Sequence, residues 1–165
     1  MTDWTQQAEA LNRFIRPLTY PLAVKLVKSV DEFPEKTRRP SRDMGFKTNV
    51  CVGMTMARKY GWTVGMMADD NACPIAAYTY GWSEPESETK KALIDFLQVM
   101  KYSANENAAK TTMEAVEQVK LSRGKYAGVV FSPLEWTKIN PDLVMIFCNP
   151  AQVMRLVHGA TQETG

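Results

Sequence analysis

The stretch Tyr126-Ala127-Gly128-Val129-Val130-Phe131 predicts the centre of the fold. It is almost continuously apolar and as long as a typical strand, which is the pattern of a strand covered on both faces. A second run of this kind, residues 143–147, follows after a connection that contains prolines. We expect the two runs to be neighbouring buried strands of one sheet, flanked by a long helix predicted over 84–101.

Further elements extend outward from this pair. Residues 21–27 and 62–67 have the length and composition of strands. Helical spacing of apolar residues, or helix start and stop signals, predict the other helices at 3–16, 48–60, 74–80, 108–121 and from Asn149 onward. The sequence therefore predicts an α+β (mixed α/β) fold. It would be a single-domain sandwich over residues 1–165, with a central sheet of about four strands flanked by helices.

Composition and charge exclude several classes of protein. The 165 residues include 20 Lys and Arg against 18 Asp and Glu, which gives a net charge of +2. Because the basic residues are scattered, with only 36–39 locally basic, we expect no nucleic-acid partner. No apolar run is long enough to span a membrane and the N-terminus lacks a signal-peptide pattern, so we expect no membrane and a cytoplasmic location. Three cysteines, an odd number, indicate reduced thiols.

Two cysteines stand at predicted helix starts. Pro74 suits the first position of a helix because its missing N–H would have no partner there, which makes Cys73 the N-cap residue. Cys51 lies in the first turn of the helix over 48–60. Free backbone amides and the positive end of a helix dipole favour the thiolate, the form of cysteine that attacks electrophiles and binds metals. Since both helices end in Tyr-Gly-Trp and flank one strand, we expect the two thiols to share a pocket.

The same residues also have purely structural interpretations. Free cysteine often packs as a small hydrophobic residue, so Cys51 and Cys73 can be inert, and inert packing is the interpretation we favour for Cys148. His158, the lone histidine, stands near the last turn of the final helix, where a cation is favoured, and we do not interpret it as a ligand. No closely spaced pair of cysteines, glycine-rich phosphate loop or Gly-x-Ser-x-Gly motif occurs.

Several short motifs follow one another along nearly the whole chain. They are residues 20–27, 49–51, 70–74, Gly81 and 149–156. Together they resemble the family called domain of unknown function 169, and the resemblance implies that Cys51 and Cys73 belong to family motifs. Asp70 and Asn71 stand in the motif of Cys73, so we count them with the two cysteines as candidate cofactor-binding residues. Family members usually continue well past Asn149, so we expect a C-terminal part to be absent here and a cofactor site to be incomplete or completed by a partner chain.

Three functional hypotheses remain open. In the first, the chain is a binding protein whose Cys51 and Cys73 hold a soft metal, an iron–sulfur centre or a thiol-reactive small molecule. The cofactor is unknown, with an iron–sulfur centre or zinc possible, and two thiolates are too few for a closed four-ligand site, so a partner would supply the rest. In the second, a thiol redox enzyme uses Cys73 as nucleophile and Cys51 as resolving thiol. In the third, the thiols are inert and the chain is a non-catalytic subunit of a larger assembly.

The final predicted helix, 150–158, is the candidate interface. Its apolar face consists of Val153, Leu156 and Val157, and we expect this face to be partly exposed in a monomer. An uncovered apolar patch usually marks an interface, so we expect a homo-oligomer or a partner subunit at this helix. The alternative is that the first helix, with Trp4 and Leu11, folds over the same face.

Overall fold

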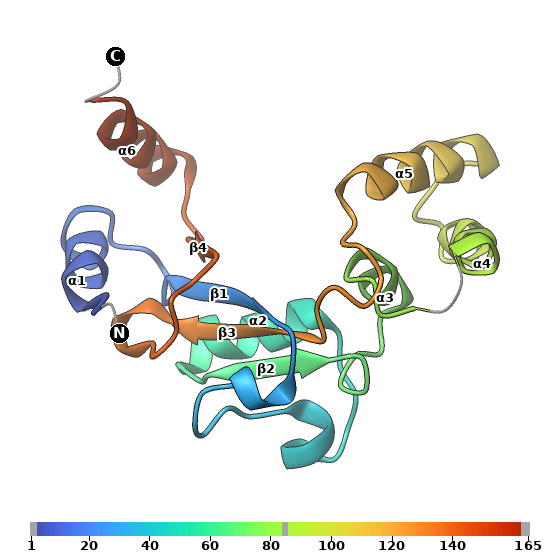
Figure 1. The fold of residues 1–165 in the computed structure, drawn as a ribbon. Helices are drawn as coiled ribbons and strands as arrows, with labels where there is room; N and C mark the ends of the chain where they lie inside the picture. Colours follow the sequence, from blue (N-terminus) through green and yellow to red (C-terminus); the bar gives the residue numbers. More distant parts are fainter. Residues whose placement is uncertain (1–2, 84–85, 163–165) are drawn as a thin grey trace.

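The computed structural model describes residues 3–83 and 86–162, and it confirms an α+β fold built on a four-stranded antiparallel sheet (Figure 1). The helices are α1 (Thr5–Phe14), α2 (Val50–Tyr60), α3 (Pro74–Thr79), α4 (Glu86–Val99), α5 (Glu106–Val119) and α6 (Pro150–Thr161). The strands are β1 (Leu22–Val27), β2 (Val64–Met67), β3 (Gly128–Pro133) and β4 (Leu143–Met145). Short turns of 3₁₀ or π helix occur at η1 (Val30–Glu32), η2 (Pro40–Met44) and η3 (Leu134–Trp136).

Strand β3 lies in the interior of the sheet, whose order is β2-β3-β1-β4. It pairs with β1 along its whole length, from Leu22 opposite Pro133 to Val27 opposite Gly128, and with β2 on its other side. All six residues of β3 are buried. The prediction that the apolar run ending at Phe131 forms a central buried strand is therefore confirmed.

The prediction for the second apolar run is wrong in two respects. Strand β4 is not a neighbour of β3, because β1 lies between them, and β4 pairs with β1 over only three residues. It is also an exposed edge strand, with Leu143 50% and Val144 38% accessible to solvent. The physical reason is that a strand needs apolar residues on both faces when apolar groups lie next to both faces. This is true of a strand packed in the core and also of an edge strand that lines apolar pockets, so the sequence pattern is the same.

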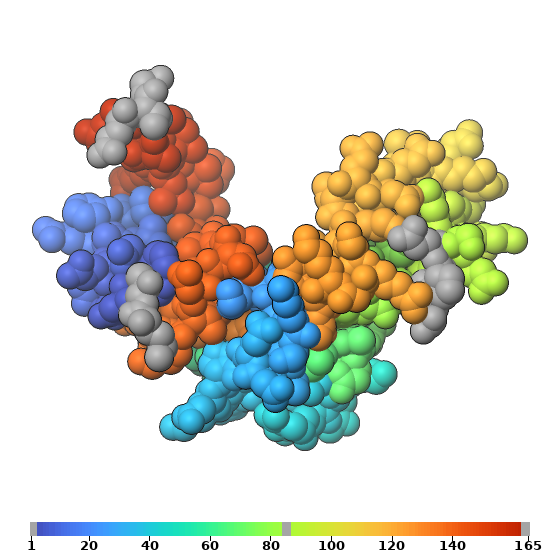
Figure 2. All heavy atoms as spheres, viewed as in Figure 1, coloured from blue at the N-terminus to red at the C-terminus, as the bar shows by residue number. Residues whose placement is uncertain are grey.

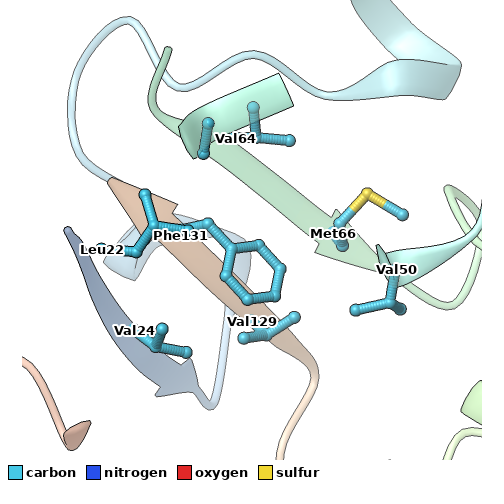
Figure 3. Close-up of a cluster of buried hydrophobic side chains, with 8 residues drawn as sticks. Leu22, Val24, Val50, Val64, Met66, Val129 and Phe131 are labelled. Atoms are coloured by element: carbon cyan, nitrogen blue, oxygen red, sulfur yellow. The ribbon is translucent and has the colours of Figure 1, made fainter. Parts of the chain in front are cut away.

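Helix α2 covers one face of the sheet. Its Val50 and Ala57 pack against β-strand side chains in a buried cluster that is centred on Phe131 and Met66 (Figure 3). The helix comes unusually close to β2, because a Cβ atom built at Gly53 would lie only 2.8 Å from the sulfur of Met66. Glycine at this position allows the close approach that closes the core.

Helix α1 covers part of the opposite face. Ala8 of α1 packs with Ala23, Val27 and Val130 of the sheet, and Trp4 and Leu11 border this second cluster. The sheet is thus covered by α2 on one face and by α1 on part of the other, as expected for an α+β sandwich.

Helices α3, α4 and α5 form a separate group at one end of the sheet, with its own small core (Figure 1). Leu93 and Leu97 of α4 pack there against Met113 of α5 and Tyr78 of α3. The prediction that the long helix from residue 84 flanks the central strands is therefore wrong, since α4 packs against α5 and α3 instead. The stripe of apolar residues on α4 correctly indicated a buried face, but it could not identify the partner.

Helix α6 stands at the other end, so the surface is hollowed between α6 and the α4–α5 pair (Figure 2). Asn149 is the N-cap residue at its start, as the Asn-Pro sequence predicts, and it also forms a capping box with Gln152. Val153 and Val157 are about half exposed, at 45% and 51%, which confirms that the apolar face of this helix is partly uncovered. Within the described part of the chain, none of the helices is long and apolar enough to cross a membrane.

Candidate functional site

A mostly apolar pocket of about 530 Å³ lies on the side of the sheet that α2 covers. Its walls come from β1, β3, β4, α2 and α3, so it is built by elements from most of the chain. Both Cys51 and Cys73 line it, and we call it the Cys51/Cys73 pocket. Its other residues used below are Asn49, Ala76, Thr79, Tyr80, Phe131, Asp142, Leu143 and Met145.

A short backbone pairing brings the two cysteines to one pocket. Thr48 and Asn71 form an isolated parallel bridge. In it the Thr48 N–H donates to the carbonyl of Asp70 at 2.9 Å, and the Ala72 N–H donates to the carbonyl of Thr48 at 3.0 Å. Helices α2 and α3 begin two and three residues after this bridge, at Val50 and Pro74, so the bridge brings the starts of both helices to one pocket.

Cys73 is the N-cap residue of α3, as the Cys-Pro sequence predicts. Its backbone is fixed by Asn71, whose side-chain oxygen accepts from the Cys73 N–H at 3.1 Å and whose amide nitrogen donates to the Cys73 carbonyl at 2.7 Å. Asn71 is buried, does not line the pocket, and therefore acts on the site by orienting Cys73. Its proposed direct contact with a cofactor stays a prediction.

Cys51 lies in the first turn of α2 and is exposed to solvent, whereas Cys73 is half-buried. Cys51 thus borders both the pocket and the solvent. The third cysteine, Cys148, lies outside this pocket, and its thiol is 3.9 Å from the carbonyl oxygen of Ile146.

Asp70 is fully buried and does not line the pocket. One carboxylate oxygen accepts from Arg39 Nε at 2.8 Å and from the Met67 N–H at 3.0 Å. The other accepts from the backbone N–H and the hydroxyl of Ser41, at 3.0 and 2.5 Å. These bonds fasten η2 to the turn after β2, so Asp70 holds the segment that leads into Cys73.

Arg39 connects this buried carboxylate to the surface. Its Nη2 atom lies 2.7 Å from Asp70 and 2.5 Å from the exposed Asp69. Burial by itself would lower the pKa of Arg39, but the hydrogen bonds and negative charges of Asp70 and Asp69 outweigh it and raise this pKa. Arg39 therefore stays charged and keeps Asp70 paired.

The few polar groups of the pocket come from Asn49, Thr79, Tyr80 and Asp142. Asp142 already accepts from the Leu26 N–H at 2.7 Å. Burial raises the pKa of Tyr80, so its hydroxyl stays protonated and is a hydrogen-bond donor at neutral pH. The pocket therefore offers an apolar interior and only a small number of polar contacts.

The sequence prediction placed a metal at Cys51 and Cys73. Among residues 3–83 and 86–162, no group of three or more His, Cys, Asp or Glu side chains lies close enough together to hold a metal ion. The two thiols are therefore without a third donor of this kind in the described part of the chain.

Sequence reasoning missed most of the pocket wall and the partner of Asp70. Phe131 and Met145 were expected only as core residues, and Arg39 was expected only as part of a basic loop. No local signal could have identified them, because Arg39 and Asp70 come from different loops. Asn49 was named only as part of the family motif 49–51, and its place on the pocket wall follows from the position of α2.

Comparisons with known proteins give a family but no activity. Residues 10–165 match the profile of domain of unknown function 169, which is described as uncharacterised ArCR. The chain is also similar to uncharacterized protein MJ0308 of Methanocaldococcus jannaschii, with 26% identity over 149 residues, covering 87% of this chain and 58% of the relative. The chain thus spans less than two thirds of that relative's length. No solved structure matches the chain.

Proposed function

The chain belongs to the family of domain of unknown function 169, and we propose that it is a binding protein for a small apolar ligand, held in the Cys51/Cys73 pocket. The observation that carries this proposal is the pocket itself, about 530 Å³ in volume, mostly apolar, and lined by two free thiols. Small-molecule sites in proteins are typically concave, mostly apolar and roughly 300–1,000 Å³ in volume.

The thiols suggest which ligands the pocket would favour. Sulfur is soft and polarisable, and a free cysteine reacts with electrophilic carbon when it is accessible. Because Cys51 is exposed and lines the pocket, a ligand with a soft or electrophilic atom would place that atom at this rim. The polar groups of Asn49, Thr79 and Tyr80 would orient the rest of the molecule.

The other sequence hypotheses require more than the pocket supplies. A zinc or iron–sulfur site needs about four protein ligands, and Cys51 and Cys73 provide two, so a partner chain would have to provide the others. A redox enzyme needs the two sulfurs to form a disulfide. An intramolecular bond between Cys51 and Cys73 after mild oxidation with diamide, found by peptide mass analysis, would favour that alternative over simple binding.

The binding proposal is tested by filling the pocket. We expect Ala76→Phe to weaken binding of an uncharged apolar fluorescent probe, N-phenyl-1-naphthylamine, about tenfold or more, because the new ring would occupy space in the pocket. Ala72→Phe is the matched control, since Ala72 is exposed and does not line the pocket. Probe binding is measured by fluorescence titration.

Modification of the thiols provides a second measurement for the same proposal. Bound probe should slow the reaction of Cys51 with N-ethylmaleimide, and Cys51→Ser should keep probe affinity while losing this reaction. If Ala76→Phe folds like the wild type and binds the probe equally well, the probe occupies another surface and the proposal is wrong.

Assembly is a second candidate function, favoured by the exposed face of α6. Val153 and Val157 are about half exposed, and β4 is an edge strand that pairs with β1 alone among the described strands. We expect light scattering at micromolar concentration to give a mass above the 18.6 kDa of one chain. Leu156→Glu should reduce the mass to one chain, while Met100→Glu, an exposed residue after α4, should not. A uniform 18.6 kDa particle for the wild type would contradict assembly.

A further inference from the structure

A second and smaller cleft, of about 250 Å³, lies where α1 ends and β1 begins. It shares no residue with the Cys51/Cys73 pocket. One wall is the segment that connects α1 to β1, and the other is Arg58 from the last turn of α2. We call it the Arg58 cleft, and its lining residues are Asn12, Pro17, Leu18, Thr19, Tyr20 and Arg58.

Two of the residues that line this cleft, Thr19 and Arg58, each carry a buried and unpaired polar atom. Among the described residues, neither the Thr19 hydroxyl oxygen nor Arg58 Nε has a hydrogen-bond partner. Buried polar groups are nearly always hydrogen-bonded, because an unmade bond leaves the cost of removing water uncompensated. A guanidinium only donates, and a hydroxyl can donate, so the group that would satisfy both atoms is an acceptor.

The charges around the cleft favour a negative acceptor. No Asp or Glu lines the cleft, and Arg58 makes no ion pair with another described residue. The end of α1 would normally present its carbonyl oxygens here, but Gln152 donates to the carbonyls of Ile15 and Arg16 at 3.0 and 2.7 Å. Since these carbonyls are occupied by a neutral amide, they repel an anion less than free carbonyls would.

The guanidinium of Arg58 is held in a fixed orientation. Its central carbon lies 4.2 Å from the centre of the Phe147 ring, which places the cation over the aromatic face. The Nε–H of this guanidinium has no hydrogen-bond partner among the described residues. Planar, pre-oriented N–H donors of this kind match the oxygen atoms of phosphate and carboxylate groups.

We propose that the Arg58 cleft binds a small oxyanion, a phosphate or carboxylate group, with Arg58 Nε and the Thr19 hydroxyl as its donors. The side chains of Asn12 and Tyr20 line the same cleft and are further polar contacts for it. The volume suits an anionic group of a small molecule and is below that of typical drug-sized sites. This site is independent of the ligand proposed for the Cys51/Cys73 pocket.

The test is a titration of the whole chain with sodium phosphate and, separately, with sodium acetate, at an ionic strength held constant with sodium chloride. NMR shifts of the Thr19 and Tyr20 amides and of the Arg58 Nε–H should change and saturate. Thr19→Val, which removes the hydroxyl at nearly constant volume, should weaken binding about tenfold, and Arg58→Gln about thirtyfold or more.

Arg13→Gln is the matched control, because the Arg13 guanidinium lies over the ring of Phe14 and Arg13 does not line the cleft. The affinity of this variant for each anion should stay within about twofold of the wild-type affinity. Tighter binding of phosphate than of acetate assigns the site to phosphate groups, and the reverse order assigns it to carboxylates. If Arg58→Gln fails to fold, Thr19→Val decides. The proposal is overturned if neither anion gives saturable shifts, or if Thr19→Val binds as tightly as the wild type.

Discussion

Replacing Asp70 by alanine is expected to lower the free energy of unfolding by about 3–5 kcal/mol. The carboxylate is fully buried and accepts hydrogen bonds from Arg39, Ser41 and Met67. Alanine would leave these donors unpaired, and the guanidinium of Arg39, whose side chain is only 11% exposed, would lose its buried counter-charge. Urea unfolding followed by circular dichroism measures the change.

Asp69→Ala is the matched control for Asp70→Ala. Asp69 contacts the same Arg39 but is 65% exposed, so its loss should change stability by about 1 kcal/mol or less. The double variant Arg39→Met with Asp70→Leu should recover part of the loss, since it removes both buried charges. Equal losses for Asp69→Ala and Asp70→Ala would show that burial does not decide the strength of these pairs.

Replacing Phe131 by alanine is expected to cost about 3–5 kcal/mol of unfolding free energy. Phe131 is 2% exposed, lies opposite Val24 on β1 and Val64 on β2, and packs in the buried cluster between the sheet and α2 (Figure 3). Its ring also forms part of the wall of the Cys51/Cys73 pocket. The variant should therefore unfold at lower urea concentration and bind the apolar probe with altered affinity.

Val119→Ala is a suitable comparison for Phe131→Ala, because Val119 is apolar but 72% exposed at the end of α5. Its unfolding free energy should change by about 0.5 kcal/mol or less. Phe131→Leu, which keeps most of the buried volume, should lose less than Phe131→Ala. A loss below about 1 kcal/mol for Phe131→Ala would show that the neighbouring side chains close the space and that the central core is misassigned.

Local signals in the sequence predicted the helix starts and ends well. Pro74 placed Cys73 at the N-cap, and Asn149 with Pro150 placed the start of α6. Gly61 ends α2 in the left-handed conformation, with φ of 72°. These features depend on residues within one turn of each other, so they could be recognised without knowledge of the fold.

Strand β4 shows why the arrangement of the sheet was harder to predict. Leu143 and Met145 line the Cys51/Cys73 pocket, while Val144 lines a separate apolar pocket between α1 and α6. Both faces of β4 are therefore next to apolar space, which produces the same continuous apolar sequence as a strand in the core. Only the position of β4 beside β1 distinguishes the two cases.

For the candidate site, too, some features follow from local sequence and others only from the tertiary structure. The sequence by itself determined that Cys51 and Cys73 stand at two helix starts, because caps and proline positions are local properties. The tertiary structure decided that these starts lie side by side, through the pairing of Thr48 with Asn71, and that Asp70 is buried against Arg39. Such contacts join segments that are far apart in the chain. The same local sequence pattern is compatible with many tertiary arrangements, and the packing of the whole sheet with its helices determines which arrangement forms.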